Sequence, residues 1–106
     1  MRGVLVVWLV GCGGSSTARD FPRACDESFE GDCVLFSGPD WLPTEVSEGC
    51  AGDVVDECPD GAIGRCVIDG GTRFETQSYF YPGFWTAQSA SEACRTRFSN
   101  SSWLPQ

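Results

Sequence analysis

Cysteine content is the feature that most constrains how this chain can fold. The chain has 106 residues and seven cysteines, six of which lie between residues 25 and 94 with at least seven residues between neighbours. Six cysteines in a small domain of an oxidising compartment are typical of three disulfides, each stabilising by about 2–4 kcal/mol. No C-x-x-C pair occurs, which argues against zinc-knuckle and thioredoxin-type sites. The predicted disulfide residues are Cys25, Cys33, Cys50, Cys58, Cys66 and Cys94.

The cysteines and tryptophans also recur in a pattern that predicts an internal duplication. The C-x7-C segment at residues 25–33 is matched by residues 58–66, and the W-x5-S-E-x-C segment at 41–50 is matched by 85–94. The second copy carries eleven additional residues between these two segments. The pattern therefore predicts a first repeat over residues 25–57 and a second repeat over residues 58–106.

Each copy is expected to form a strand followed by a helix. In the first copy, residues 33–36 form a short apolar strand, and Thr44 caps a helix from Glu45 to about Cys50. In the second copy, the glycines after Asp69 favour a hairpin turn between strands at residues 65–68 and 72–81.

A second helix is predicted after this hairpin, capped by Thr86 or Ser89 and ending near Phe98. The predicted fold class is therefore α+β. We expect a small disulfide-rich domain of two strand–helix repeats, with a β-hairpin in the second copy.

The sequence leaves the disulfide pairing open between two symmetrical schemes. The apolar stripe of the second helix includes Cys94, which favours a scheme that joins each strand to its own helix. That scheme pairs Cys33 with Cys50, Cys66 with Cys94 and Cys25 with Cys58. The other scheme pairs Cys25 with Cys33, Cys58 with Cys66 and Cys50 with Cys94.

Residues 1–11 have the composition of an export signal. Arg2 precedes seven apolar residues, which are too few to span a bilayer, since a spanning helix needs about 20. The sequence Leu-Val-Gly-Cys that ends at Cys12 resembles a bacterial lipobox, whose cysteine becomes the lipid-bearing N-terminus. Residues 12–24 then form the lipidated N-terminus and a Gly- and Ser-rich tether to the domain at residues 25–106. The alternative is cleavage after Ala18, which would release a soluble secreted effector or inhibitor.

The lipobox, the tether and the cysteine pattern together resemble small cysteine-rich bacterial lipoproteins of uncharacterised function. The resemblance implies a cell-envelope protein that is anchored in the membrane through palmitate-type lipid on Cys12, with its domain in the periplasm or at the cell surface. Gly13 stands where some lipoproteins carry the aspartate that retains them in the inner membrane, which favours the outer membrane. The resemblance implies no activity.

Charge and composition narrow the expected chemistry. Loss of Arg2 with the signal leaves six Arg against fifteen Asp and Glu, a net charge of −9, so nucleic acid is not an expected partner. Histidine and lysine are absent, which removes the commonest general base and all Schiff-base chemistry. We therefore expect a non-enzymatic protein without a cofactor or a metal. The acidic residues Asp53, Asp56, Glu57 and Asp60 lack the alternate-residue spacing of a calcium loop and are interpreted as a solvated loop.

The densest aromatic segment, residues 79–85, supplies the candidate binding face. Tyr79 and Tyr81 should point to one side of a strand and Phe80 to the other. Together with Trp85, the two tyrosines would bind a protein or glycan partner, because Tyr and Trp are enriched at binding surfaces. The favoured interpretation is instead that these rings fill the core of a domain with few Leu and Ile residues, because Trp41 and Trp85 occupy equivalent places in the two copies.

Overall fold

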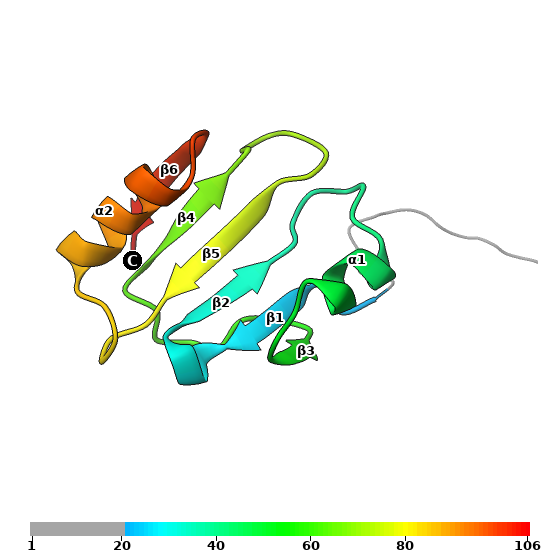
Figure 1. Cartoon of the computed structure of the whole chain (residues 1–106), viewed down its shortest axis with the longest axis horizontal. Helices are drawn as coiled ribbons and strands as arrows, with labels where there is room; N and C mark the ends of the chain where they lie inside the picture. The colour runs from blue at the N-terminus through cyan, green and yellow to red at the C-terminus, as the bar shows by residue number, and fades with distance from the viewer. Residues whose placement is uncertain (1–20) are drawn as a thin grey trace, which may run out of the picture.

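The computed structural model describes residues 21–106, which form an antiparallel sheet of six strands with two helices on one of its faces (Figure 1). The strand order is β3-β1-β2-β5-β4-β6. The predicted signal peptide, Cys12 and the tether up to residue 20 lie outside the described residues. The elements are β1 (Ala24–Glu27), a 3-10 turn (Ser28–Glu30), β2 (Asp32–Leu35), α1 (Pro43–Glu48), β3 (Asp53–Val55), β4 (Gly64–Ile68), β5 (Thr76–Phe80), α2 (Ala87–Arg97) and β6 (Ser101–Pro105).

This architecture corrects the predicted fold class. Residues 21–106 form mainly antiparallel β-structure, and α2 is the one helix among them longer than seven residues. The prediction of an α+β domain with two strand–helix repeats is therefore wrong. Three strands that the sequence did not reveal, β1, β3 and β6, make the difference. They are three to five residues long and show little apolar alternation, so they carry almost no local strand signal.

The two halves of the sheet share one connectivity. In each half a hairpin is followed by a helix, and the strand after the helix pairs with the outer side of the first hairpin strand (Figure 1). The halves meet where β2 pairs with β5. Phe36 and Trp41 pack edge-to-face at 5.0 Å between ring centroids in the first half, and Phe80 and Trp85 do so at 4.8 Å in the second.

The register of the hairpins also corrects the predicted match between the copies. Cys25 lies opposite Val34 in the first hairpin, and Cys66 lies opposite Ser78 in the second. Cys25 therefore corresponds in position to Cys66. The C-x7-C pattern predicts Cys58 at this position, and that prediction is wrong. The longer loop of the second hairpin hides this correspondence in the sequence.

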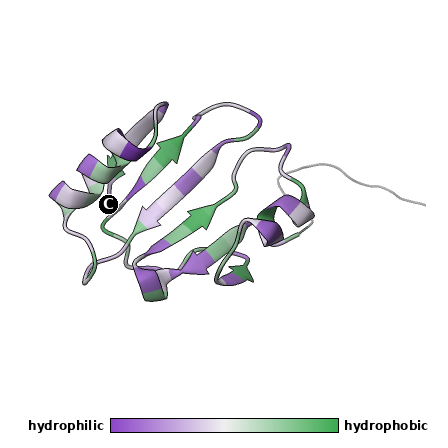
Figure 2. Ribbon diagram, in the orientation of Figure 1, coloured by the Kyte–Doolittle hydropathy of each residue, from purple (hydrophilic) through white to green (hydrophobic). Residues whose placement is uncertain are grey.

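Two clusters fill the space between the sheet and its helices. Val46 of α1 is buried against Cys25 and Phe36. On the other half, Ala90 and Ala93 of α2 pack on the cluster that contains Phe80, Cys66 and Cys94. Small residues on α2 allow its backbone to approach the sheet closely. Figure 2 shows hydrophobic residues in β2 and β4 beside more hydrophilic ones in β5.

The opposite face of the sheet is covered in part by the segment that connects β3 to β4. Ala62 of this segment packs with Ala24, Cys33 and Tyr81 in a third buried cluster. The hydroxyl of Tyr81 donates a hydrogen bond to the carbonyl of Pro59 at 2.8 Å. Burial of the phenol, followed by nearby acidic groups, raises the pKa of Tyr81 to about 12.

The N-terminus of α2 agrees with the sequence prediction, and that of α1 differs from it. Thr86, one of the two predicted caps, is the N-cap of α2, and its side chain accepts the backbone N–H of Ser89 at 3.0 Å. The first helix begins at Pro43 rather than Glu45, because proline suits the first helical position. Glu45 instead accepts the backbone N–H of Leu42, the N-cap residue, at 2.9 Å.

The six predicted cysteines form three disulfides, and one of the three pairings is the one predicted from the sequence. The pairs are Cys25–Cys50, Cys33–Cys58 and Cys66–Cys94. Cys66–Cys94 confirms one pair of the favoured scheme, and the other pairs of both schemes are wrong. The cause is the register of β1 and β2. Cys25 faces α1 and Cys33 faces the β3–β4 segment, so Cys50 after α1 reaches Cys25 and leaves Cys33 for Cys58.

Candidate functional site

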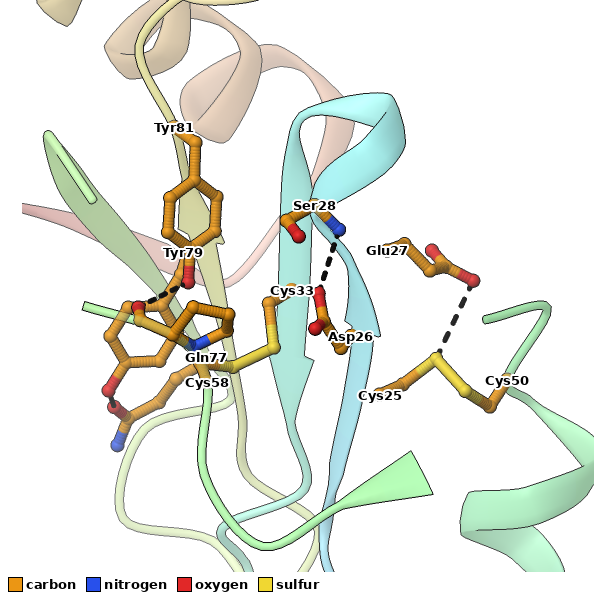
Figure 3. The surroundings of a disulfide bond; sticks show 11 residues. Cys25, Asp26, Glu27, Ser28, Cys33, Cys50, Cys58, Gln77, Tyr79 and Tyr81 are labelled. Atoms are coloured by element: carbon orange, nitrogen blue, oxygen red, sulfur yellow. Dashed lines mark hydrogen bonds between the residues drawn. A yellow bond between two sulfur atoms is a disulfide. The ribbon is translucent and has the colours of Figure 1, made fainter. Parts of the chain in front are cut away.

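The disulfides crosslink both faces of the sheet. Figure 3 shows Cys33–Cys58 on the side of Tyr79 and Tyr81, and Cys25–Cys50 on the other side of β1 and β2. Disulfides persist in oxidising compartments, so this framework indicates an extracellular or periplasmic environment. None of the helices within residues 21–106 has the length and apolar content needed to cross a membrane.

The structure separates the three residues of the predicted binding face. Tyr79 and Tyr81 do lie on one side, next to Cys33, while Phe80 faces α2. Trp85 packs on Phe80 in the helix-side core, because the chain turns after β5 and crosses to that side. Tyr81 is buried, at 8% exposure. Of the three, Tyr79 is therefore the one that combines partial exposure with a position beside a cleft.

The cleft next to Tyr79, here called the tyrosine cleft, has a volume of about 270 Å³. The Tyr79 hydroxyl donates to the side-chain oxygen of Gln77 at 3.3 Å, and the Arg65 guanidinium lies 5.9 Å from the ring centroid. These contacts restrain the ring at the edge of a polar depression. The residues that line the cleft include Leu35, Glu57, Cys58, Asp60, Ala62 and Tyr79.

A second, larger depression was not predicted from the sequence and is called the aromatic groove. Its volume is about 520 Å³, within the range of ligand sites. It lies beside α1, at the end of the sheet where the loop after β2 meets the loop of the second hairpin. The groove is lined by Phe21, Arg23, Pro39, Asp40, Trp41, Leu42, Pro43, Glu45 and Phe74.

The rings of the aromatic groove are held in fixed positions. Trp41 packs edge-to-face between Phe36 and Phe74, with ring centroids at 5.0 and 5.2 Å. Its indole N–H donates to the carbonyl of Glu75 at 2.9 Å. Arg23 lies over the ring of Phe21 at 4.2 Å. These contacts leave Trp41 only partly exposed, in the lining of the groove.

Glu75 joins the two loops that carry the groove. Its carboxylate accepts the hydroxyl of Ser37 at 2.6 Å and the backbone N–H of Gly71 at 2.9 Å. The Ser37 hydroxyl first, then Gly71 and the Gln77 amide, hold the pKa of Glu75 below its ordinary value. The carbonyl of Glu75 also accepts the N–H of Gly38 at 2.9 Å. The carboxylate is therefore a structural support of the groove.

The acidic segment does not form a calcium-binding arrangement in residues 21–106. Asp53 belongs to β3, while Asp56, Glu57 and Asp60 follow on an exposed loop. The one group of three possible metal-ligating residues found within the described part of the chain is Cys25, Glu27 and Cys50. Its two sulfurs are joined in a disulfide. Glu27 there accepts the backbone N–H of Ala51 at 2.9 Å.

Comparisons with protein families, curated proteins and solved structures found no match to this chain.

Proposed function

We propose that this chain is a lipid-anchored, non-enzymatic module of the cell envelope, bound to the membrane through lipid on Cys12. Its disulfide-crosslinked domain would lie in the periplasm or at the cell surface, with the outer membrane as the favoured site. The extracellular or periplasmic environment indicated by the disulfides is compatible with this proposal.

The observation that carries the proposal is the lipobox-like sequence at Cys12 and the Gly- and Ser-rich residues after it. The pairing of the other cysteines is compatible with it. The structure joins all six cysteines of residues 21–106 to one another, and the sequence contains seven. Cys12 is the seventh, so no cysteine in the described part of the chain is left to bond with it. Lipidation gives this odd cysteine a role. Cleavage after Ala18 would remove Cys12 and leave the same six paired cysteines, so the Gly- and Ser-rich sequence at residues 13–17 is what favours the anchor over the soluble alternative.

The tyrosine cleft is the proposed binding surface for a protein or glycan partner. Tyr79 presents a partly exposed ring, and Glu57 and Asp60 supply hydrogen-bond acceptors beside it. An aromatic ring flanked by polar side chains is a common arrangement at binding surfaces. Nucleic acid remains an unsuitable partner because residues 21–60 contain eleven acidic residues and a single Arg.

Metabolic labelling with a palmitate analogue tests the anchor. We expect label on the wild-type chain and none on Cys12→Ser, with Ser15→Ala as a matched control that retains the label. The intact mass of the wild type should show an acylated N-terminus at Cys12. An unlabelled protein whose mass begins at Arg19 would contradict the proposal and establish the soluble alternative, in which the signal is cut after Ala18.

A glycan array and a cross-linking screen with the wild-type protein test the cleft. Tyr79→Ala should lose the binding, because it removes the ring at the edge of the cleft. Phe84→Ser, which changes an exposed ring elsewhere on the molecule, is the matched control and should retain it. Binding that survives Tyr79→Ala would remove the cleft from the proposal.

A further inference from the structure

The aromatic groove presents apolar side chains next to the point where the described chain begins. Leu42 and Phe74 are 57% and 48% exposed, and Phe21, the first described residue, is itself part of the lining. Side chains of this size are usually buried in a small domain. Their grouping around one depression points to a surface that is covered in the working protein.

From these features we propose that the aromatic groove docks on the surface of the lipid bilayer, at the boundary between headgroups and acyl chains. The proposal rests on the lipid anchor at Cys12 proposed above. Eight residues separate Cys12 from Phe21. A stretch of that length can span at most about 30 Å. The anchor therefore keeps Phe21, and with it the groove that Phe21 lines, within about 30 Å of the attachment point in the membrane.

The chemistry of the groove fits the interfacial region of a bilayer. Trp41 combines an apolar ring with an indole N–H, and such side chains favour the headgroup level. The charges at the groove are balanced, since Arg73 pairs with Asp40 at 2.8 Å. Arg23 donates to the carbonyl of Gly38 at 3.1 Å. Because its charges are balanced, the groove itself is not repelled by a membrane. The acidic remainder of residues 21–60 would be repelled by an anionic surface. A zwitterionic bilayer is therefore the preferred surface.

The opposite end of the sheet provides an internal control. Phe29 and Phe84 are also exposed there, at 63% and 60%, and the backbone of Gly31 joins the two loops that carry them. The length of β1 separates this end of the sheet from Phe21, the residue at which the described chain begins. The acidic residues Glu30 and Asp32 lie one and three positions after Phe29 in the sequence. We expect these two rings to remain in water while the groove contacts lipid.

Tryptophan quenching by brominated lipid tests the docking. The full lipidated chain is reconstituted into vesicles of phosphatidylcholine and phosphatidylethanolamine with brominated acyl chains. Bromine quenches a tryptophan that reaches the acyl boundary, so Trp41→Phe should remove most of the quenchable fluorescence. Trp103→Phe should retain it, because Trp103 packs in the core beneath α2.

Substitutions at the surface of the groove complete the test. Leu42→Ser with Phe74→Ser should abolish most of the quenching, and the matched pair Phe29→Ser with Phe84→Ser should leave it unchanged. All four side chains are exposed, so these variants should fold, and flotation with the vesicles confirms that they remain anchored.

The possible failures are distinguishable. A chain that floats with the vesicles while Trp41 stays unquenched overturns the docking alone and shows that the groove faces away from lipid, toward a protein partner or a second copy. A chain that carries no acyl mass and does not float overturns the proposed anchor and the docking together.

Discussion

The Cys66–Cys94 disulfide is expected to be the crosslink whose loss destabilises the domain most. Both cysteines are buried, at 0% and 1% exposure, and the bond spans a sequence separation of 28. The entropy of closing a loop of that length corresponds to about 3.6 kcal/mol at 25 °C. Replacing both cysteines with alanine also leaves a cavity between α2 and β4, which adds about 1 kcal/mol. The expected loss of about 4–5 kcal/mol is a large share of the stability of a small domain.

The Cys25–Cys50 pair provides the matched control. Its sequence separation of 25 gives nearly the same entropic contribution, about 3.5 kcal/mol, but Cys50 lies partly at the surface. Urea unfolding followed by tryptophan fluorescence gives the free energy of unfolding of each double alanine variant. The Cys66→Ala/Cys94→Ala variant should be the less stable of the two, by about 1 kcal/mol. The reasoning is refuted if this variant is as stable as the wild type, or more stable than the control.

Three further predictions follow from buried charge, hydrogen bonding and close backbone packing. Burial first, and then Glu27 and Glu30, raise the pKa of Asp32. The charged form of Asp32 therefore destabilises the fold at pH values above this raised pKa. Asp32→Asn should raise Tm at pH 7, and thermal melts near pH 4 should show that this gain disappears. The lowered pKa of Glu75 has the opposite sign: its stabilisation is present above the ordinary carboxyl range and is lost on acidification, so Glu75→Gln should lower Tm at pH 7 and have little effect near pH 3. Gly38→Ala would place a methyl group against the backbone of the second hairpin, and urea unfolding should show a loss of about 2 kcal/mol or more; wild-type stability would contradict this packing.

The second half of the sheet was the more predictable one from the sequence. The turn glycines after Asp69 marked the hairpin of β4 and β5, and the stripe on α2 placed Cys94 toward the sheet. Both are local signals, so Cys66–Cys94 could be predicted without the topology. The second hairpin strand nevertheless begins at Thr76 rather than Thr72, because Thr72 returns to the carbonyl of Asp69 and extends the turn.

The first half depends on contacts between distant parts of the chain. The four residues of β1 and the three of β3 become strands by pairing with their neighbours, since their own sequences contain little β-preference beyond Val54 and Val55. The pairing of Cys33 with Cys58 follows from which face of β2 the later β3–β4 segment covers. No spacing rule contains that information.

The candidate sites also include features that local sequence predicts and features that depend on contacts between distant parts of the chain. The alternation of β5 correctly placed Tyr79 and Tyr81 on one side and Phe80 on the other. The turn after β5 moved Trp85 to the other side of the sheet, which strand alternation cannot foresee. The sequence did not predict the aromatic groove, because Phe21 and Phe74 come together through the pairing of β1 with β2 and of β2 with β5.

A disulfide map of the native protein tests the crosslinked sheet most directly. Acidic residues separate all six cysteines of residues 25–94, so cleavage after Asp and Glu under non-reducing conditions should yield three distinct pairs of linked peptides. Mass spectrometry should identify Cys25 with Cys50, Cys33 with Cys58 and Cys66 with Cys94. Peptides that link Cys33 with Cys50, or Cys25 with Cys33, would contradict the register of β1 and β2 and the sheet built on it.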